Sequence, residues 1–202
     1  RESIKTKLAG LFNVYNNLAA FGMAIELGMR SEDIKKGILR INKIKGRFQF
    51  LKLGQDFDIV IDYAHTPDGL ENVIKAAKEI GSKRVITVFG CGGDRDKKKR
   101  PMMGKIAGKG SDEVIITSDN PRTENPEDII EEIAEGLKNL DVVYKKIIDR
   151  REAIKHVLKQ AKKGDIVLIA GKGHEDYQIF KDKVISFSDY QVVEEELRKI
   201  LN

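Results

Sequence analysis

The sequence predicts an α/β protein with a Rossmann-like, mostly parallel sheet and helices on both faces. From residue 48 onward, short apolar runs alternate with longer segments of helical periodicity, and each apolar run stops abruptly at a polar loop. Strands that alternate with helices pair in parallel through right-handed crossovers. The expected strands are Asp58–Ile61, Arg84–Phe89, Val114–Thr117, Val142–Ile147 and Ile166–Ala170.

Helices are expected after each of these strands. Thr66 is a suitable N-cap and Pro67 suits the first helical position, so a helix is predicted over Asp68–Glu79. Pro101 is expected to open the next helix, which runs through Ile106. The later helices are expected at Pro126–Leu137, Arg151–Ala161 and Tyr190–Leu201.

A β-hairpin is expected between the last strand and the last helix. Tyr177–Phe180 and Val184–Phe187 are short runs separated by a turn at Lys181-Asp182. We expect this hairpin to add an antiparallel edge to the sheet.

The first 45 residues have a different character. Leu8–Leu27 reads as a buried helix, and Ser31 is a good N-cap for a second helix over Glu32–Leu39. These helices have no strand to pack on. We therefore assign residues 1–45 to the tail of a preceding domain and residues 46–202 to the α/β domain.

Composition limits the function classes. The 202 residues are 41% hydrophobic and 34% charged, and no apolar run approaches the length of a membrane span. The net charge of 37 − 32 = +5 is too small and too dispersed for a nucleic-acid-binding surface. A single cysteine, Cys91, excludes an internal disulfide and fits a reducing compartment. Because the chain begins at Arg1 rather than Met, we expect it to be a piece of a longer protein.

Four polar loops follow strands and should gather at one edge of a parallel sheet. The most informative is Asp119-Asn120-Pro121-Arg122, which offers a carboxylate, an amide and a guanidinium within four residues. A ligand with both an ammonium and a carboxylate would match it, although an ordinary turn with a surface arginine explains the same residues. The other loops are Asp62–His65, Gly90–Arg100 and Gly171–Glu175.

The Gly90–Arg100 loop has two interpretations. Gly90, Gly92 and Gly93 could let backbone N–H groups approach an anion, but their spacing is not that of a known phosphate loop, and a tight turn explains them equally well. The run Lys97–Arg100 is by default solvated, and only Arg100, beside the helix start, is expected to face a ligand.

Metal and thiol chemistry are not expected. His65, His156 and His174 lack the short spacing of metal ligands. Cys91 has no thiolate-activating partner in the sequence and is best explained as a small residue in a glycine turn.

Together the loops resemble those of the Mur ligase family, and in particular the members that add diaminopimelate. The resemblance covers the whole chain, with four long motifs in the family's order. Phe12–Asn16 and Gly46-Arg47 resemble the end of the ATP-binding central domain and its junction with the C-terminal domain. The four motifs are Asp62-Tyr63-Ala64-His65-Thr66-Pro67-Asp68, Phe89-Gly90-Cys91-Gly92-Gly93-Asp94-Arg95-Asp96, Asp119-Asn120-Pro121-Arg122 and Gly171-Lys172-Gly173-His174-Glu175-Asp176-Tyr177-Gln178.

The resemblance implies part of an ATP-dependent amide ligase of bacterial peptidoglycan synthesis. Such an enzyme adds meso-diaminopimelate to the nucleotide dipeptide UDP-MurNAc-L-Ala-D-Glu, and it is cytoplasmic. The family's G-K-T/S phosphate loop, its carbamylated lysine and its UDP-sugar domain have no counterpart in this sequence. ATP and Mg²⁺ would accordingly be held mainly by residues outside this chain, which is expected to be monomeric, to be inactive alone, and to bind neither nucleic acid nor membrane.

The resemblance also implies two sets of site residues, none of them catalytic. The set expected to bind diaminopimelate is Arg100, Asp119, Asn120, Pro121, Arg122, Gly171 and Glu175. The set expected to contact the nucleotide is Asn13, Asn16, Arg47, Asp62, Tyr63 and His65.

Three alternatives remain open at this point. The chain could belong to a lysine-adding ligase or to a relative such as cyanophycin synthetase or folylpolyglutamate synthase. Arg122 favours diaminopimelate, because lysine has no distal carboxylate. The chain could also be a binding module without catalysis. Nucleic-acid binding has only Lys97–Arg100 in its favour, and the neighbouring Asp94 and Asp96 argue against it.

Overall fold

A six-stranded sheet forms the centre of the computed structural model, which describes residues 3–81 and 83–201. The strand order is β1-β2-β6-β3-β4-β5, in which β1 is antiparallel to β2 and the other neighbours are parallel. All five expected strands are present, each to within one residue at either end. The strands are β1 (Gln49–Leu51), β2 (Asp58–Asp62), β3 (Arg84–Phe89), β4 (Glu113–Ile116), β5 (Val143–Lys146) and β6 (Asp165–Ala170).

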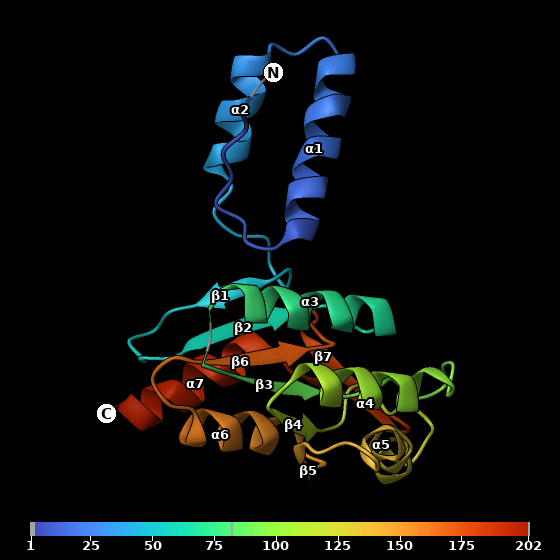
Figure 1. The fold of residues 1–202 in the computed structure, drawn as a ribbon. Coiled ribbons are helices and arrows are strands. Elements are labelled where there is room, and N and C mark those ends of the chain that lie inside the picture. The colour runs from blue at the N-terminus through green and yellow to red at the C-terminus, as the bar shows by residue number, and fades with distance from the viewer. Residues whose placement is uncertain (1–2, 82, 202) are drawn as a thin grey trace.

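Helices cover both faces of this sheet (Figure 1). One apolar cluster joins the sheet to α3 (Pro67–Glu79), α4 (Lys99–Gly110) and α5 (Pro126–Ala134), which a 3₁₀ turn extends over Glu135–Leu137. A second cluster joins the other face to α6 (Arg150–Gln160) and α7 (Asp189–Leu201). Side chains of a strand alternate between the faces, so both faces carry buried apolar residues and need a covering layer.

The start of α3 is as the sequence predicts. Thr66 Oγ1 accepts a hydrogen bond from the backbone N–H of Gly69 at 3.2 Å, and Pro67 occupies the first turn. The start of α4 differs from the prediction, because the helix begins at Lys99 rather than at Pro101. That shift of two residues matters for Arg100, as described below.

The expected hairpin is present as β7 (Tyr177–Phe180) and β8 (Lys183–Ser186), but it forms a two-stranded sheet of its own. The antiparallel edge of the main sheet is instead β1, which the sequence analysis did not foresee. β1 has only three residues and follows Phe48, whose φ of 43° is unusual for a residue with a side chain. So short a strand carries too little periodicity to be recognised.

Two N-terminal helices, α1 (Leu11–Glu26) and α2 (Ser31–Arg40), project from the α/β body (Figure 1). The expectation of a buried first helix does not hold for the described residues. Leu18 is 52% exposed and Met23 is 65% exposed, whereas the buried members of α1 are Asn13 and Asn17. Such uncovered apolar surface is typical of an interface.

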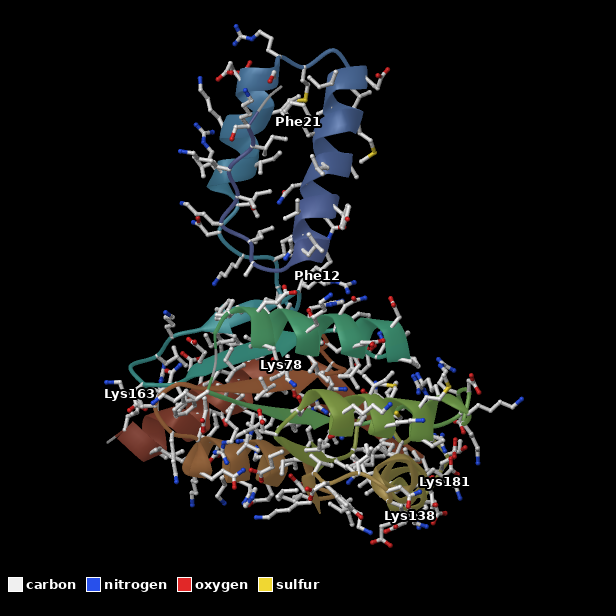
Figure 2. All side chains as sticks on the ribbon, in the orientation of Figure 1. Phe12, Phe21, Lys78, Lys138, Lys163 and Lys181 are labelled. Carbon is white, nitrogen blue, oxygen red and sulfur yellow. The ribbon has the colours of Figure 1, made fainter. Side chains whose placement is uncertain are left out.

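Aromatic side chains connect the N-terminal helices to the body. Phe12 packs edge-on against Phe48 with ring centroids 5.7 Å apart, and Phe48 packs in the same way against Phe50 at 5.6 Å. In Figure 2, Phe12 lies at the base of α1, where the helix meets the body, and Phe21 lies farther out. The junction is thus a small apolar contact at one end of α1.

Candidate functional site

The four polar loops meet at the carboxyl edge of the sheet, as predicted, and enclose a pocket of about 340 Å³. We call this the edge pocket. Five of the seven residues predicted to bind the amino acid line it. The lining residues are Tyr63, His65, Thr66, Gly92, Arg95, Asp96, Lys99, Asp119, Asn120, Arg122, Gly171 and Glu175.

The Asp119–Arg122 loop is held in place by the hairpin. Gln178 Nε2 donates to the carbonyl oxygen of Asp119 at 2.7 Å, and the N–H of Ile179 donates to Asn120 Oδ1 at 3.0 Å. The N–H of Arg122 donates in turn to the carbonyl of Ile179 at 3.0 Å. Hydrogen bonds to strand β7 therefore fix the conformation of the Asp119–Arg122 loop.

The glycine loop packs directly against the same segment. The N–H of Gly93 donates to the carbonyl of Asn120 at 2.9 Å, and a Cβ on Gly93 would lie 1.9 Å from the carbonyl oxygen of Pro121. A Cβ on Gly90 would lie 2.2 Å from the carbonyl oxygen of Thr117. Close packing of two loops thus accounts for these glycines, and the Gly93 N–H is already bonded.

Arg122 has both a structural tether and free donors. Its backbone is left-handed, with φ 53°, and its Nη1 donates to the carbonyl of Gly93 at 2.8 Å. Within the part of the chain that the structure describes, Nε and Nη2 have no hydrogen-bond partner. The guanidinium lines the edge pocket, so these donors remain available to a ligand.

Arg100 does not line the edge pocket, contrary to the prediction. Its guanidinium is fully buried, with Nη1 2.9 Å from Glu124 Oε2 and Nη2 2.9 Å from Glu124 Oε1. A further hydrogen bond of 2.9 Å joins Nη1 to Glu132 Oε2. The hydrogen bonds from Arg100 to Glu124 hold the pKa of the Glu124 carboxyl down at about 2. Because α4 begins at Lys99, Arg100 falls on its inner face with Met103.

Arg95 and Lys99 line the edge pocket in place of Arg100. The sequence analysis passed over both residues, because a charged run gives no sign of which members turn inward. Lys99 Nζ also donates to the carbonyl of His65 at 3.0 Å, which ties α4 to the loop after β2.

Two buried cations behind the pocket were also missed. Lys172 Nζ lies 3.1 Å from both Asn120 Oδ1 and Glu175 Oε2. Arg150 pairs with Asp189 through two bonds of 2.8 Å, and its Nη2 donates to the carbonyl of Ala170 at 3.0 Å. Apart from the position of Lys172 between two glycines, nothing local in the sequence marks either residue.

A second pocket of about 640 Å³ lies where α1 meets the body, and we call it the junction pocket. All six residues predicted to contact a nucleotide line it: Asn13, Asn16, Arg47, Asp62, Tyr63 and His65. Tyr63, His65 and Thr66 line both pockets and so form the wall between them.

Aromatic and cationic groups stack at this wall. The Arg47 guanidinium lies 5.1 Å from the centre of the Tyr63 ring, which is flanked by His65 at 4.6 Å and His174 at 5.0 Å. Burial raises the pKa of the Tyr63 hydroxyl, and the nearby Glu175 adds to that effect. The wall therefore presents flat, polarisable surfaces to both pockets.

Asp62 fixes the backbone of the junction. Its Oδ2 accepts from the N–H of Phe48 at 2.6 Å and its Oδ1 from the N–H of Ala64 at 2.7 Å. Burial raises the pKa of this carboxyl, and the two backbone bonds and Arg47 oppose that rise. Gly46 has φ 67°, and a Cβ there would lie 2.3 Å from the backbone nitrogen of His174, so only glycine fits.

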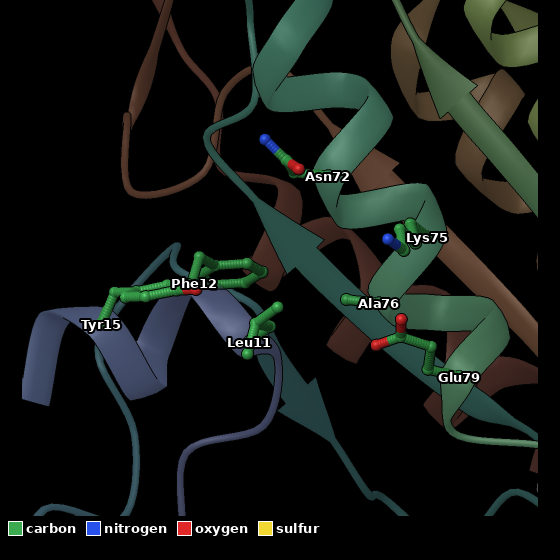
Figure 3. Close-up of a pocket in the computed structure, with 7 residues that line it drawn as sticks. All are labelled: Leu11, Phe12, Tyr15, Asn72, Lys75, Ala76 and Glu79. Atoms are coloured by element: carbon green, nitrogen blue, oxygen red, sulfur yellow. The ribbon is translucent and has the colours of Figure 1, made fainter.

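Two further cavities lie near these pockets. Pro121, predicted to bind the amino acid, lines a neighbouring cavity of about 540 Å³ together with Arg122 and the hairpin tip. A groove of about 240 Å³ lies between α1 and α3, where Leu11 and Tyr15 face Lys75 and Glu79 (Figure 3). Neither cavity is lined by Asp119, Gly171 or Glu175, which the edge pocket brings together with Arg122.

Among residues 3–81 and 83–201, no three or more histidine, cysteine or acidic side chains form a cluster that could hold a metal ion. Nor does any helix in these ranges have the length and hydropathy required to cross a bilayer.

Comparison with known proteins places the chain in a family. Residues 46–173 match the family model described as "Mur ligase, glutamate ligase domain". The UDP-N-acetylmuramoyl-L-alanyl-D-glutamate–2,6-diaminopimelate ligase of Syntrophomonas wolfei is 52% identical over 196 residues, which are 96% of this chain and 40% of that protein. The corresponding ligase of Clostridium acetobutylicum is 47% identical over 202 residues, or 99% of this chain and 42% of the relative.

A solved structure supports the same family assignment. A UDP-N-acetylmuramoyl-L-alanyl-D-glutamate–2,6-diaminopimelate ligase matches with a TM-score of 0.77 and 41% identity, over 98% of this chain and 41% of that one. The chain thus spans about two fifths of the length of the relatives that it matches. The matching family model, the identities near 50% and the shared fold together show that this chain belongs to the Mur ligase family.

Proposed function

We propose that the chain is the amino-acid-binding part of an ATP-dependent ligase that adds meso-diaminopimelate to UDP-MurNAc-L-Ala-D-Glu. The observation that carries this proposal is the convergence of Asp119, Arg122, Gly171 and Glu175 in one pocket. Carboxylates and a carbonyl accept hydrogen bonds from an ammonium, while a guanidinium donates to a carboxylate. Each end of diaminopimelate carries one ammonium and one carboxylate.

In this pocket Arg122 would bind the distal carboxylate of the amino acid. Its Nε and Nη2 are the donors left over after Nη1 has bonded to Gly93. Arg95 supplies a second guanidinium in the same pocket, in the role that the sequence analysis gave to Arg100. Asp119, Glu175 and the carbonyl of Gly171 would take the distal ammonium.

The junction pocket is suited to the nucleotide. Its lining combines an aromatic ring, a guanidinium and amides, which can stack on a base and bond to ribose or phosphate. ATP would supply the activation of the dipeptide carboxylate. Mg²⁺ would be held mainly by residues of the full-length enzyme outside this chain, as the resemblance implies.

The exposed apolar face of α1 supports a division of the chain near residue 45. The family model starts at residue 46, and Leu18 and Met23 of α1 have no covering layer in the described chain. We assign residues 1–45 to the end of the ATP-binding domain of the full-length enzyme. Domain closure would then bring the amine in the edge pocket to the activated carboxylate, across the Tyr63–Thr66 wall.

Replacing Arg122 with alanine in the full-length enzyme tests the proposal. Sites built to pair with a polar group can reject an analogue without it by roughly 10⁴-fold. We therefore expect Arg122→Ala to lower kcat/KM for diaminopimelate strongly and to shrink its lead over lysine. Arg122→Lys should restore only part of the activity, because an ammonium lacks the planar fork.

Two results would reject parts of the proposal. Wild-type enzyme that turns over lysine better than diaminopimelate would place it with the lysine-adding ligases. Equal losses for both amino acids in Arg122→Ala, with a lower melting temperature, would reduce Arg122 to a tether of its own loop through Gly93. Arg198→Ala, on the exposed face of α7, serves as the control and should change the kinetics with neither substrate.

A further inference from the structure

Lys172 is a fully enclosed charged group beside the edge pocket. Its side chain has no exposed surface, yet it comes from the loop after β6 that lines the pocket. Nζ lies 3.1 Å from Asn120 Oδ1, 3.1 Å from Glu175 Oε2 and 3.6 Å from Asp119 Oδ1. One buried ammonium thus joins the loop that carries Asp119 to the loop that carries Glu175.

In each of the two carboxylates, Asp119 and Glu175, one oxygen faces Lys172 and the other does not. Asp119 Oδ1 faces Lys172, whereas Oδ2 lies over Gly171, 2.8 Å from the position that a Cβ would take there. Glu175 Oε2 accepts from both Lys172 and Asn120 Nδ2. Asp119 Oδ2 and Glu175 Oε1 have no hydrogen-bond partner among the described residues.

Asn120 completes the arrangement and fixes its orientation. The N–H of Ile179 can only donate, so the atom that it contacts at 3.0 Å must be the amide oxygen. The amide nitrogen is then directed to Glu175 Oε2, at 3.0 Å. Asn120 is therefore occupied internally, and its side chain supports the two carboxylates rather than binding the ligand.

We propose that Lys172 is a positioning residue for the amino-acid site: it holds one oxygen of Asp119 and one of Glu175, and so presents the other two to a single ligand ammonium. The inference rests on the proposed function. Two carboxylates and one lysine leave a net charge of −1 in this cluster, which one ligand ammonium neutralises. Without Lys172, two adjacent carboxylates would repel each other and turn away from this arrangement.

Kinetics of Lys172→Met in the full-length ligase test the proposal. We expect KM for diaminopimelate to rise by at least about tenfold, since hydrogen bonds to charged groups are lost, while KM for ATP changes by less than about twofold. Diaminopimelate and lysine share the distal ammonium, so kcat/KM should fall by the same factor for both. Arg122→Ala, in contrast, should change their ratio.

A double-mutant cycle separates positioning from a general structural role. If Lys172 acts through Glu175, then Lys172→Met should cost much less in a Glu175→Gln background than in the wild type. Lys163→Met, in an exposed turn before β6 and thus at the opposite end of that strand from Gly171, is the matched control and should behave as wild type. Additive effects in the cycle would overturn the proposal.

The outcome remains decisive if the methionine variant does not fold. Lys172→Gln keeps a donor toward Asn120 and Glu175 but removes the charge, so it should also raise KM for the amino acid. A folded variant of either kind with an unchanged KM for diaminopimelate would overturn the role of Lys172. Inactivity of the wild-type ligase with diaminopimelate would instead count against the proposed function, which keeps the two failures distinct.

Discussion

At the scale of single residues, the buried Arg100–Glu124 pair stands out because it lies beside the binding loops without entering the pocket. Glu124 Oε1 also accepts from the N–H of Asp94 at 2.6 Å, so the pair joins the glycine loop to the start of α5. A bidentate bond of this kind fixes geometry as well as charge. Arg100 thus shapes the loop that carries Arg95.

The Arg100–Glu124 pair should make stability depend on pH in the acid range. The pairing lowers the pKa of Glu124 from 4.5 to about 2. A carboxyl with a lowered native pKa stabilises the fold above its unfolded pKa, and this contribution is lost as the pH falls from about 4.5 towards 2. The free energy of unfolding of wild type should therefore exceed that of Glu124→Gln at pH 7, and the gap should narrow at pH 3.

Urea unfolding at the two pH values measures this gap. Glu71→Gln, on the exposed side of α3, controls for the loss of a negative charge and should show no such narrowing. If the free energies of unfolding of wild type and Glu124→Gln differ by the same amount at both pH values, the pKa of Glu124 is not lowered in the folded protein.

Cys91 should be inert in the folded protein. Its thiol is 2% exposed, lies 3.6 Å from the sulfur of Met103, and has a pKa raised by burial to about 12. The thiolate is the reactive form, so alkylation by iodoacetamide at pH 8 should be very slow in the native chain and fast in denaturant. Mass spectrometry measures the labelling. If Cys91 of the native chain is labelled rapidly, the Gly90–Arg100 loop must open in solution.

At the scale of secondary-structure elements, the Arg150–Asp189 pair connects helices to strand ends. Arg150 begins α6 and Asp189 begins α7, and neither side chain is exposed. The guanidinium also reaches the carbonyls of Ser118 and Ala170, which immediately precede Asp119 and Gly171. The pair thus anchors the first residues of the Asp119–Arg122 loop and of the Gly171–Glu175 loop.

Asp189→Asn should therefore be strongly destabilising. Removing one partner of a buried ion pair leaves an uncompensated charge, which typically costs about 3–5 kcal/mol. Chemical denaturation of the variant should show a loss of this size. Asp182→Asn, the same change at the exposed hairpin turn, should stay within about 0.5 kcal/mol of wild type. A loss below about 1 kcal/mol for Asp189→Asn would mean that Arg150 finds another partner.

At the scale of the whole molecule, the chain presents the edge pocket and the junction pocket on either side of the wall formed by Tyr63, His65 and Thr66. The edge pocket is lined only by residues of the α/β body, whereas the junction pocket also needs residues of α1 such as Asn13. Amide-bond formation requires the amine and the activated carboxylate to meet in one closed site. Under the proposed function, the chain would provide the binding surface for only the amine.

The isolated chain should accordingly hydrolyse no ATP and form no amide bond. Its sequence contains no P-loop motif of the kind that cradles phosphates ahead of a helix. A coupled assay of phosphate release on rigorously purified protein should remain at background, with or without diaminopimelate. Sustained turnover that co-purifies with the chain would refute the placement of the phosphate site outside it.

The sequence by itself determined the alternation of strands and helices, the four loops at the carboxyl edge and the family. These features are local: the period of apolar residues, the Thr66-Pro67 helix start and runs such as Asp119–Arg122 are each legible within a few residues. Because parallel strands align their carboxyl ends, the meeting of the loops followed from the strand assignment alone.

Which arginine of the Gly90–Arg100 segment faces the pocket could be learned only from the folded structure. Arg95 and Arg100 stand in one basic loop, yet the start of α4 at Lys99 turns Arg100 inward to Glu124 and leaves Arg95 at the pocket. Lys172 and Arg150 likewise acquire their roles from partners on distant loops and helices. Burial and pairing of a charge depend on contacts between segments far apart in the chain, and no local pattern specifies them.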